Sequence, residues 1–185
     1  MKYILLTFML LSCFTAISQP IKGNIFLNGK FQIEKEGEYS ISSLQPSLGY
    51  FINSKFATGI TTGITQEYPY QGSKRIGIIW GIFTRNYFPI GSEQKFFFYL
   101  HSYLQKTKFK YPNNITDNYL VIGVFPSFAF FPTEKISIDL TFIDMYYALA
   151  VDNNSIQGRN VNAFSLKGDF IYPSLSIGFF LGKRD

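Results

Sequence analysis

Apolar and polar side chains alternate along most of this chain with the period of two that is typical of β-strands. The alternation predicts eight strands, over residues 22–34, 39–52, 55–67, 74–88, 94–107, 118–131, 135–148 and 162–181. Glycine, aromatic and β-branched residues dominate them, and after residue 18 no apolar run approaches the roughly 20 residues of a transmembrane helix. The pattern therefore predicts an all-β protein.

The connections between these strands alternate in length. Those at 53–54, 89–93 and 132–134 are short, those at 68–73, 108–117 and 149–161 are longer and polar, and 35–38 is compact. Short turns on one side and longer loops on the other are the layout of outer-membrane barrels, which in bacteria have an even number of strands. The chain is therefore expected to form an eight-stranded antiparallel up-and-down transmembrane β-barrel.

The two faces of each predicted strand differ in side-chain size more than in charge. In the segment 55–67, Ile60 and Ile64 share one face, while Gly59 and Gly63 share the other. A soluble barrel needs Lys and Glu on its outward face, but only 16% of this chain is charged and 19% is aromatic. We expect the large aliphatic row to face lipid and the smaller, mixed row to fill the interior.

Aromatic residues crowd the ends of the predicted strands, which predicts two interfacial girdles, with core packing as the alternative. Near the short turns they are Tyr50, Phe51, Tyr87, Phe88, Phe96, Phe97, Phe130, Phe131, Phe179 and Phe180, and near the long loops Tyr68, Tyr119, Tyr146, Tyr147 and Phe164. Pro46, Pro126 and Pro173 also fall within strands, where a missing N–H predicts bulges.

Residues 1–18 have the features of a secretory signal peptide. Lys2 precedes an apolar run too short to span a bilayer, and Ala16-Ile17-Ser18 supplies the small residues that a signal peptidase recognises. The expected domains are this signal peptide and a single barrel over 19–185, located in the outer membrane of a Gram-negative bacterium. Cys13 is the only cysteine, and its lipidation in place of removal is the alternative.

The mature segment resembles the outer membrane β-barrel domain family, the porin-like group of small OmpA/OmpX-type barrels. The resemblance rests on Ile41–Phe51 (ISSLQPSLGYF), Gly81–Gly91 (GIFTRNYFPIG), the hairpin from Ser127–Phe131 through Ile138–Leu140, and Pro173–Phe180 (PSLSIGFF). It implies an eight-stranded outer-membrane barrel, and the matching stretches are signatures of the fold and not of catalysis. The chain departs from the family at its end, because residues 181–185 follow Phe180 where such barrels finish on an aromatic residue.

Charged and titratable residues on the inward row form the first candidate site, a lumenal polar network. Its predicted members are Lys30, Glu34, Arg85, His101, Asp139, Lys167 and Asp169. Arg85 and Asp139 each lie six residues from the middle of a short turn, so we expect them at one depth as an ion pair. A self-neutralising set of buried charges is the structural interpretation, and a proton or ion path is the alternative.

Catalytic and cofactor chemistry is not expected. His101 is the sole histidine and lies several residues above Asp139, which is unsuited to a Ser/His/Asp arrangement. No His, Cys or carboxylate cluster has metal-ligand spacing, and no Gly-rich phosphate loop follows a strand. The bases behind the net charge of +5 are mostly scattered, so nucleic acid is not an expected partner.

Two functions remain open. One is a non-enzymatic envelope protein with a structural or surface-interaction role through its external loops, in which Lys106, Lys108 and Lys110 contact lipopolysaccharide phosphates. Its expected partners are outer-membrane lipid and, during insertion of a monomer, the barrel-assembly machinery. The other is a barrel that binds a small apolar ligand, for which a lumenal cavity of several hundred Å³ would be the sign.

Overall fold

The computed structural model describes residues 23–68, 74–92, 95–112, 115–153, 163–168 and 174–181. The predicted signal peptide, Cys13 and the end of the chain after Leu181 lie outside them. The strands are β1 (Ile25–Glu36), β2 (Tyr39–Phe51), β3 (Phe56–Tyr68), β4 (Arg75–Ile90), β5 (Phe96–Lys110), β6 (Thr116–Thr133), β7 (Ile136–Thr141), β8 (Ile143–Asn153), β9 (Ala163–Gly168) and β10 (Ser174–Leu181). In this described part, no helix is long and apolar enough to cross a membrane.

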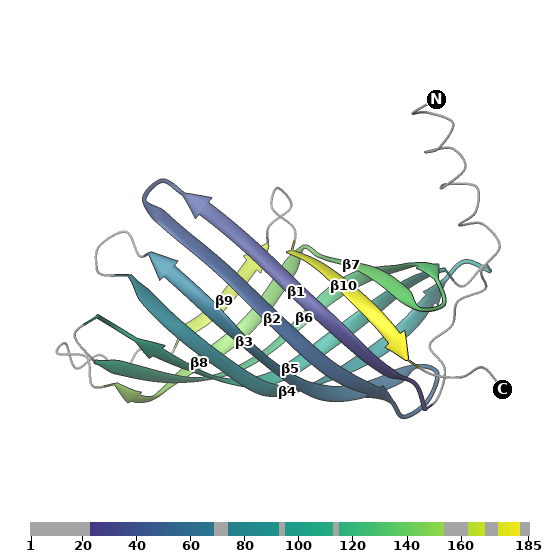
Figure 1. The fold of residues 1–185 in the computed structure, drawn as a ribbon, viewed down its shortest axis with the longest axis horizontal. Coiled ribbons are helices and arrows are strands. Elements are labelled where there is room, and N and C mark those ends of the chain that lie inside the picture. Colours follow the sequence, from purple (N-terminus) through teal and green to yellow (C-terminus); the bar gives the residue numbers. More distant parts are fainter. Residues whose placement is uncertain are drawn as a thin grey trace.

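These segments form one closed antiparallel barrel (Figure 1). β1 to β6 pair in chain order, and β1 pairs with β10, which closes the sheet. β7 and β8 both pair with β6 and are two parts of one barrel strand, interrupted at Phe142. β9 pairs with β8 and β10 with β7, so they share the last barrel strand. The predicted eight-stranded antiparallel barrel is confirmed.

Side chains alternate between the interior and the outer surface along each strand. Ile60 is 59% exposed and Ile64 61%, whereas Thr61 and Thr65 between and beside them are buried. Outward rows elsewhere are equally apolar, with Ile76, Ile78, Trp80, Ile82 and Ile122 all exposed. The prediction that the large aliphatic row points outward is confirmed, because strand periodicity leaves no other place for it.

The bulges predicted at proline are wrong where the structure describes them. The β2–β3 register passes Pro46 without a shift, from Leu44↔Ile64 to Ser47↔Thr61, and the Thr61 hydroxyl donates to the Pro46 carbonyl at 3.3 Å. Pro126 pairs with Leu100 in regular register. The ladder therefore loses a hydrogen bond without gaining a residue. Register shifts occur instead in β6, between Asn118 and Tyr119 and between Phe130 and Thr133, and Pro173 lies outside the described residues.

Candidate functional site: the barrel interior

The short-turn end of the interior is filled by aromatic rings, which we call the aromatic plug. Its members are Phe26, Phe51, Phe83, Tyr87, Phe97, Phe131 and Phe180, none more than 5% exposed. Ring centroids lie 5.3 Å apart for Phe26 and Phe51, and 5.1 Å apart for Phe131 and Phe180. An eight-stranded barrel has room only for side chains, and here bulky ones occupy that room.

The aromatic plug corrects the girdle prediction at this end. Neighbouring aromatic residues at the strand ends point in opposite directions, because successive side chains alternate. One residue of each neighbouring pair is about half exposed on the outer surface, namely Tyr50, Phe88, Phe96 and Phe179. The other residue of each pair is buried inside, namely Phe51, Tyr87, Phe97 and Phe180. Half of the predicted girdle is therefore core.

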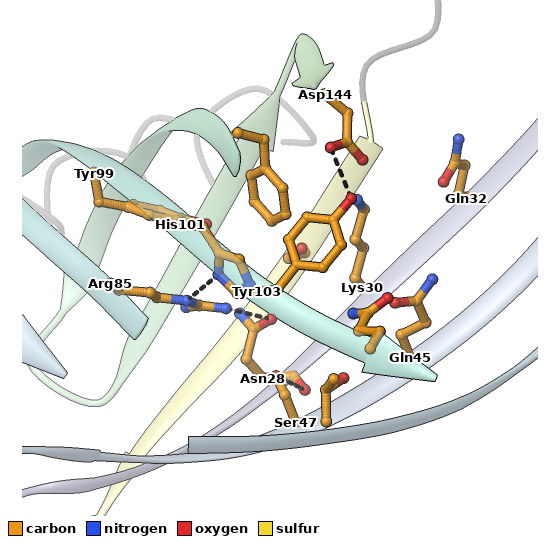
Figure 2. A pocket seen from close by; sticks show the side chains of 14 residues that line it. Asn28, Lys30, Gln32, Gln45, Ser47, Arg85, Tyr99, His101, Tyr103 and Asp144 are labelled. Atoms are coloured by element: carbon orange, nitrogen blue, oxygen red, sulfur yellow. Dashed lines mark hydrogen bonds between the residues drawn. The ribbon is translucent and has the colours of Figure 1, made fainter. Parts of the chain in front are cut away.

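Arg85 forms the centre of a polar layer above the plug (Figure 2). Its Nε donates to His101 Nδ1 at 3.0 Å, and its Nη2 donates to Asn28 Oδ1 at 3.3 Å. Its Nη1 lies 3.6 Å from Asp139 Oδ2, which also accepts from Asn28 Nδ2 and the Tyr99 hydroxyl at 3.2 Å each. Arg85 is 3% exposed and Asp139 1%, so each neutralises the other in a site without bulk water.

Aromatic faces surround the same guanidinium. The Arg85 Cζ lies 5.2 Å from the ring centroid of Phe26, 5.1 Å from that of Phe83 and 5.0 Å from that of Tyr99. The ring quadrupoles add attraction to the ion pair, and more so because the site is desolvated. We call Asn28, Arg85, Tyr99, His101 and Asp139 the Arg85 layer.

His101 is held as a structural side chain. Its ring stacks between Phe83 and Phe125, with centroids 4.9 Å and 4.2 Å away. Its Nδ1 accepts from Arg85, whereas a Ser/His/Asp triad needs a carboxylate at that position.

The other predicted lumenal residues lie higher in the barrel or outside the described part. Lys30 points inward and its Nζ lies 4.7 Å from the Phe125 ring centroid. Glu34 is half-buried on the same row of β1. The backbone of Lys167 pairs with Asp144 in the β8–β9 ladder, and Asp169 lies outside the described residues.

Asp144 is a lumenal carboxylate that the alternation missed. The inward row runs through Asp139 and Thr141, but the interruption at Phe142 shifts the phase, so that Asp144 accepts from the Tyr103 hydroxyl at 3.0 Å inside the barrel (Figure 2). No residue near Phe142 marks this shift in the sequence.

A second ionic cluster lies at the long-loop end and was also missed. Arg75 donates to Glu67 at 2.5 Å and 2.8 Å and to the Tyr111 hydroxyl at 3.1 Å, and Tyr111 donates to Asp117 Oδ2 at 2.9 Å. Burial raises the pKa of the Tyr111 phenol, which keeps its proton available for that bond. Glu67 and Arg75 are opposite each other in the β3–β4 ladder. Two opposite charges on either side of one loop could have predicted this ion pair from the sequence.

The three lysines assigned to the external loops all lie on a strand instead. β5 continues to Lys110, so Lys106, Lys108 and Lys110 occupy its outward row, opposite Trp80, Ile78 and Ile76 of β4. Lys108 and Lys110 are exposed and Lys106 is half-buried. The loop assignment was wrong because lysine disfavours strands only weakly, while pairing with β4 and β6 extends β5. We call these residues the lysine stripe.

Two cavities lie on the long-loop side of the Arg85 layer, the direction that we call above. The smaller, of about 90 Å³, lies between Lys30, Gln45, Tyr103 and the layer itself (Figure 2). The larger, of about 440 Å³, extends toward the long-loop end, between Ser43 and Thr65 on one side and Tyr119 and Tyr146 on the other. The lumen is therefore filled at the short-turn end and partly hollow at the other.

Comparison with known proteins supports the fold. No family model and no curated protein matches the chain. Among solved structures, the crystal structure of Neisserial surface protein A matches with a TM-score of 0.56 and 14% sequence identity, over 84% of this chain and 95% of that chain. At this identity the likeness is one of fold alone: both chains form eight-stranded β-barrels.

Proposed function

We propose that this protein is an integral outer-membrane barrel without enzymatic activity, which does not conduct and acts through its long-loop end, in an envelope-structural or surface-interaction role. The observation that carries this proposal is the pairing of an apolar exterior with a plugged interior. Exposed Ile, Leu and Phe side chains cover the outer wall, which in water would be an aggregation liability and in lipid is a solvated surface.

The aromatic plug and the Arg85 layer support a closed lumen. Tyr87 and Tyr99 are each 1% exposed. The Arg85 guanidinium donates hydrogen bonds to Asn28, Tyr87 and His101. An ion crossing this level would have to displace stacked rings and separate a buried ion pair, both of which are costly. A barrel of this kind leaves the loop end as the surface for partners.

Gel mobility of the protein extracted from isolated outer membranes tests the location and the fold together. We expect the unboiled protein to migrate differently from the boiled protein, because a closed barrel resists detergent until heated. We expect the extracted protein to be a monomer, because the sheet closes within one chain. We also expect it to lack residues 1–18, removed as a signal peptide, and to have been inserted by the barrel-assembly machinery.

Two outcomes contradict the proposal. Recovery in the soluble fraction with no heat-dependent shift overturns the lipid-facing assignment of the outer wall. Stepwise conductance of the purified, heat-modifiable barrel in planar bilayers overturns the closed lumen while leaving the location intact.

We further propose that the lysine stripe contacts the phosphate groups of lipopolysaccharide, a class of anionic lipid. Lys106, Lys108 and Lys110 lie one above the other on β5, beside the exposed apolar side chains of Ile76 and Ile78. The outward rows of β4, β5 and β6 carry no acidic side chain. Acyl chains can pack on the isoleucines while phosphates meet the ammonium groups beside them.

Replacing all three lysines of the stripe with glutamine should weaken lipopolysaccharide binding by about 100-fold, since each lysine near an anionic surface contributes about 1 kcal/mol. The measurement is the lipopolysaccharide retained by the purified barrel across a salt series. A matched triple variant, Lys35→Gln with Lys55→Gln and Lys135→Gln, removes the same charge from exposed positions elsewhere and should retain wild-type binding. Equal loss in both variants would show that net charge, not the stripe, is responsible.

A further inference from the structure

The upper lumen contains a cavity that the closed-barrel function does not use. Its volume of about 440 Å³ lies within the range of about 300–1,000 Å³ found for small-molecule sites. The Arg85 layer lies below it, where Tyr99 and His101 are buried. The smaller cavity lies between it and the Arg85 layer, and Gln45 and Tyr103 line both cavities. The larger cavity is therefore a cup whose wall is made of strands and below which the lumen closes at the Arg85 layer.

One side of the cup carries a group of uncharged polar side chains. Gln32 of β1, Ser43 and Gln45 of β2 and Thr65 of β3 line it, and Figure 2 shows Gln32 and Gln45 to one side of the Tyr103 ring. Ser43 and Thr65 are each 5% exposed and are paired in the β2–β3 ladder. The Ser43 hydroxyl is buried without a hydrogen-bond partner among the described residues. Such a group costs free energy until something in the cavity bonds to it.

The facing side is aromatic. Tyr103 and Phe109 of β5, Tyr119 of β6 and Tyr146 of β8 line it. Phe109 and Tyr119 are in edge contact, with centroids 5.9 Å apart. Gly77 makes room for the Phe109 ring, because a Cβ at position 77 would lie 2.8 Å from Phe109 Cε1. The wall offers ring faces and edges to a flat guest.

The charged side chains of the lining all have hydrogen-bond partners, and its one described cation is paired with a carboxylate. Arg75 is paired with Glu67 and also lies over the Phe109 ring, 4.3 Å from its centroid. Asp144 accepts from Tyr103 at 3.0 Å. Because Arg75 is already paired with Glu67, an anionic guest would lose its hydration without gaining a free cation from this lining.

We propose that the upper lumen is a binding site for a small uncharged aromatic compound that carries a hydrogen-bonding group on its edge. The ring lies against the aromatic wall, and the edge group bonds to the carboxamides of Gln32 and Gln45 and, once the Ser43 side chain turns toward the cavity, to its hydroxyl. This goes beyond the envelope role, since a closed barrel retains that role whether or not the cup is filled.

Protection of a thiol placed in the cup tests the proposal, with 2-naphthol as the probe. In a Cys13→Ser background, Ser43→Cys gives the chain a single thiol. Its rate of modification by a cationic methanethiosulfonate should fall about tenfold when 2-naphthol is present at about ten times its Kd. Ser42→Cys, on the outward row of the same strand, is the matched control and should react at an unchanged rate, which corrects for partition of the probe into detergent.

Further variants and probes define the result. Thr65→Cys reports on the same cup if Ser43→Cys does not fold, and Ala148→Trp, which fills the cavity, should abolish protection at either thiol. 2-Naphthoate, of the same shape but charged, should protect at least about tenfold more weakly. The site is refuted if 2-naphthol leaves both cup thiols unprotected, or protects position 42 equally. The uncharged specificity is refuted if the naphthoate protects as well as the naphthol.

Discussion

Arg85→Ala should lower the free energy of unfolding of the barrel by about 3–5 kcal/mol, the usual cost of removing one partner of a buried ion pair. The substitution leaves Asp139 at 1% exposure with its cation gone, and it also removes the donors to His101 and Asn28. The three rings around the guanidinium lose their cation as well. Urea unfolding of the purified barrel in detergent micelles, followed by the heat-modifiable gel band, measures the change.

A double-mutant cycle separates the ion pair from simple loss of packing. Adding Asp139→Ala to Arg85→Ala removes the stranded carboxylate, so the double variant should lose less stability than the sum of the two single variants. Lys108→Ala, an exposed lysine on the outer face of β5, serves as the control and should unfold at the wild-type urea concentration. An unchanged midpoint for Arg85→Ala would refute the role of the pair.

The sequence predicted which side of the barrel wall each residue occupies wherever the alternation is unbroken. Ile60, Ile78 and Phe83 fall on the expected faces because pairing on both sides of β3 and β4 fixes the register. Counting residues from the short turns placed Arg85 and Asp139 at one depth, and Arg85 Nη1 lies 3.6 Å from Asp139 Oδ2. Distances from the short turns were sufficient because those turns are tight and add no uncertainty in length.

The prediction failed where the backbone phase or a strand end is set by tertiary contacts. Asp144 faces the lumen because the interruption at Phe142 shifts the alternation by one residue. That interruption depends on how β7 and β8 both pair with β6. β5 continues past the predicted end at residue 107 to Lys110 because both flanking strands extend alongside it. Periodicity states where side chains alternate, but it does not state where pairing stops. The cup above the Arg85 layer depends on both, so the sequence pointed to a filled lumen.

Gly59→Ala should destabilise the barrel by about 1–3 kcal/mol, the cost of overpacking a dense core. A Cβ at this position would lie 2.6 Å from Phe83 Cζ and closer still to the Leu48 carbonyl oxygen, and a backbone atom in a paired strand cannot turn away. Gly29→Ala is the matched control, because its Cβ would meet nothing within 4 Å and should leave stability unchanged or raise it by up to about 1 kcal/mol. Urea midpoints of the two variants measure the difference. Equal midpoints would mean that both the Leu48 backbone and the Phe83 ring give way at no cost, which is incompatible with a densely packed aromatic plug and with the closed lumen that rests on it.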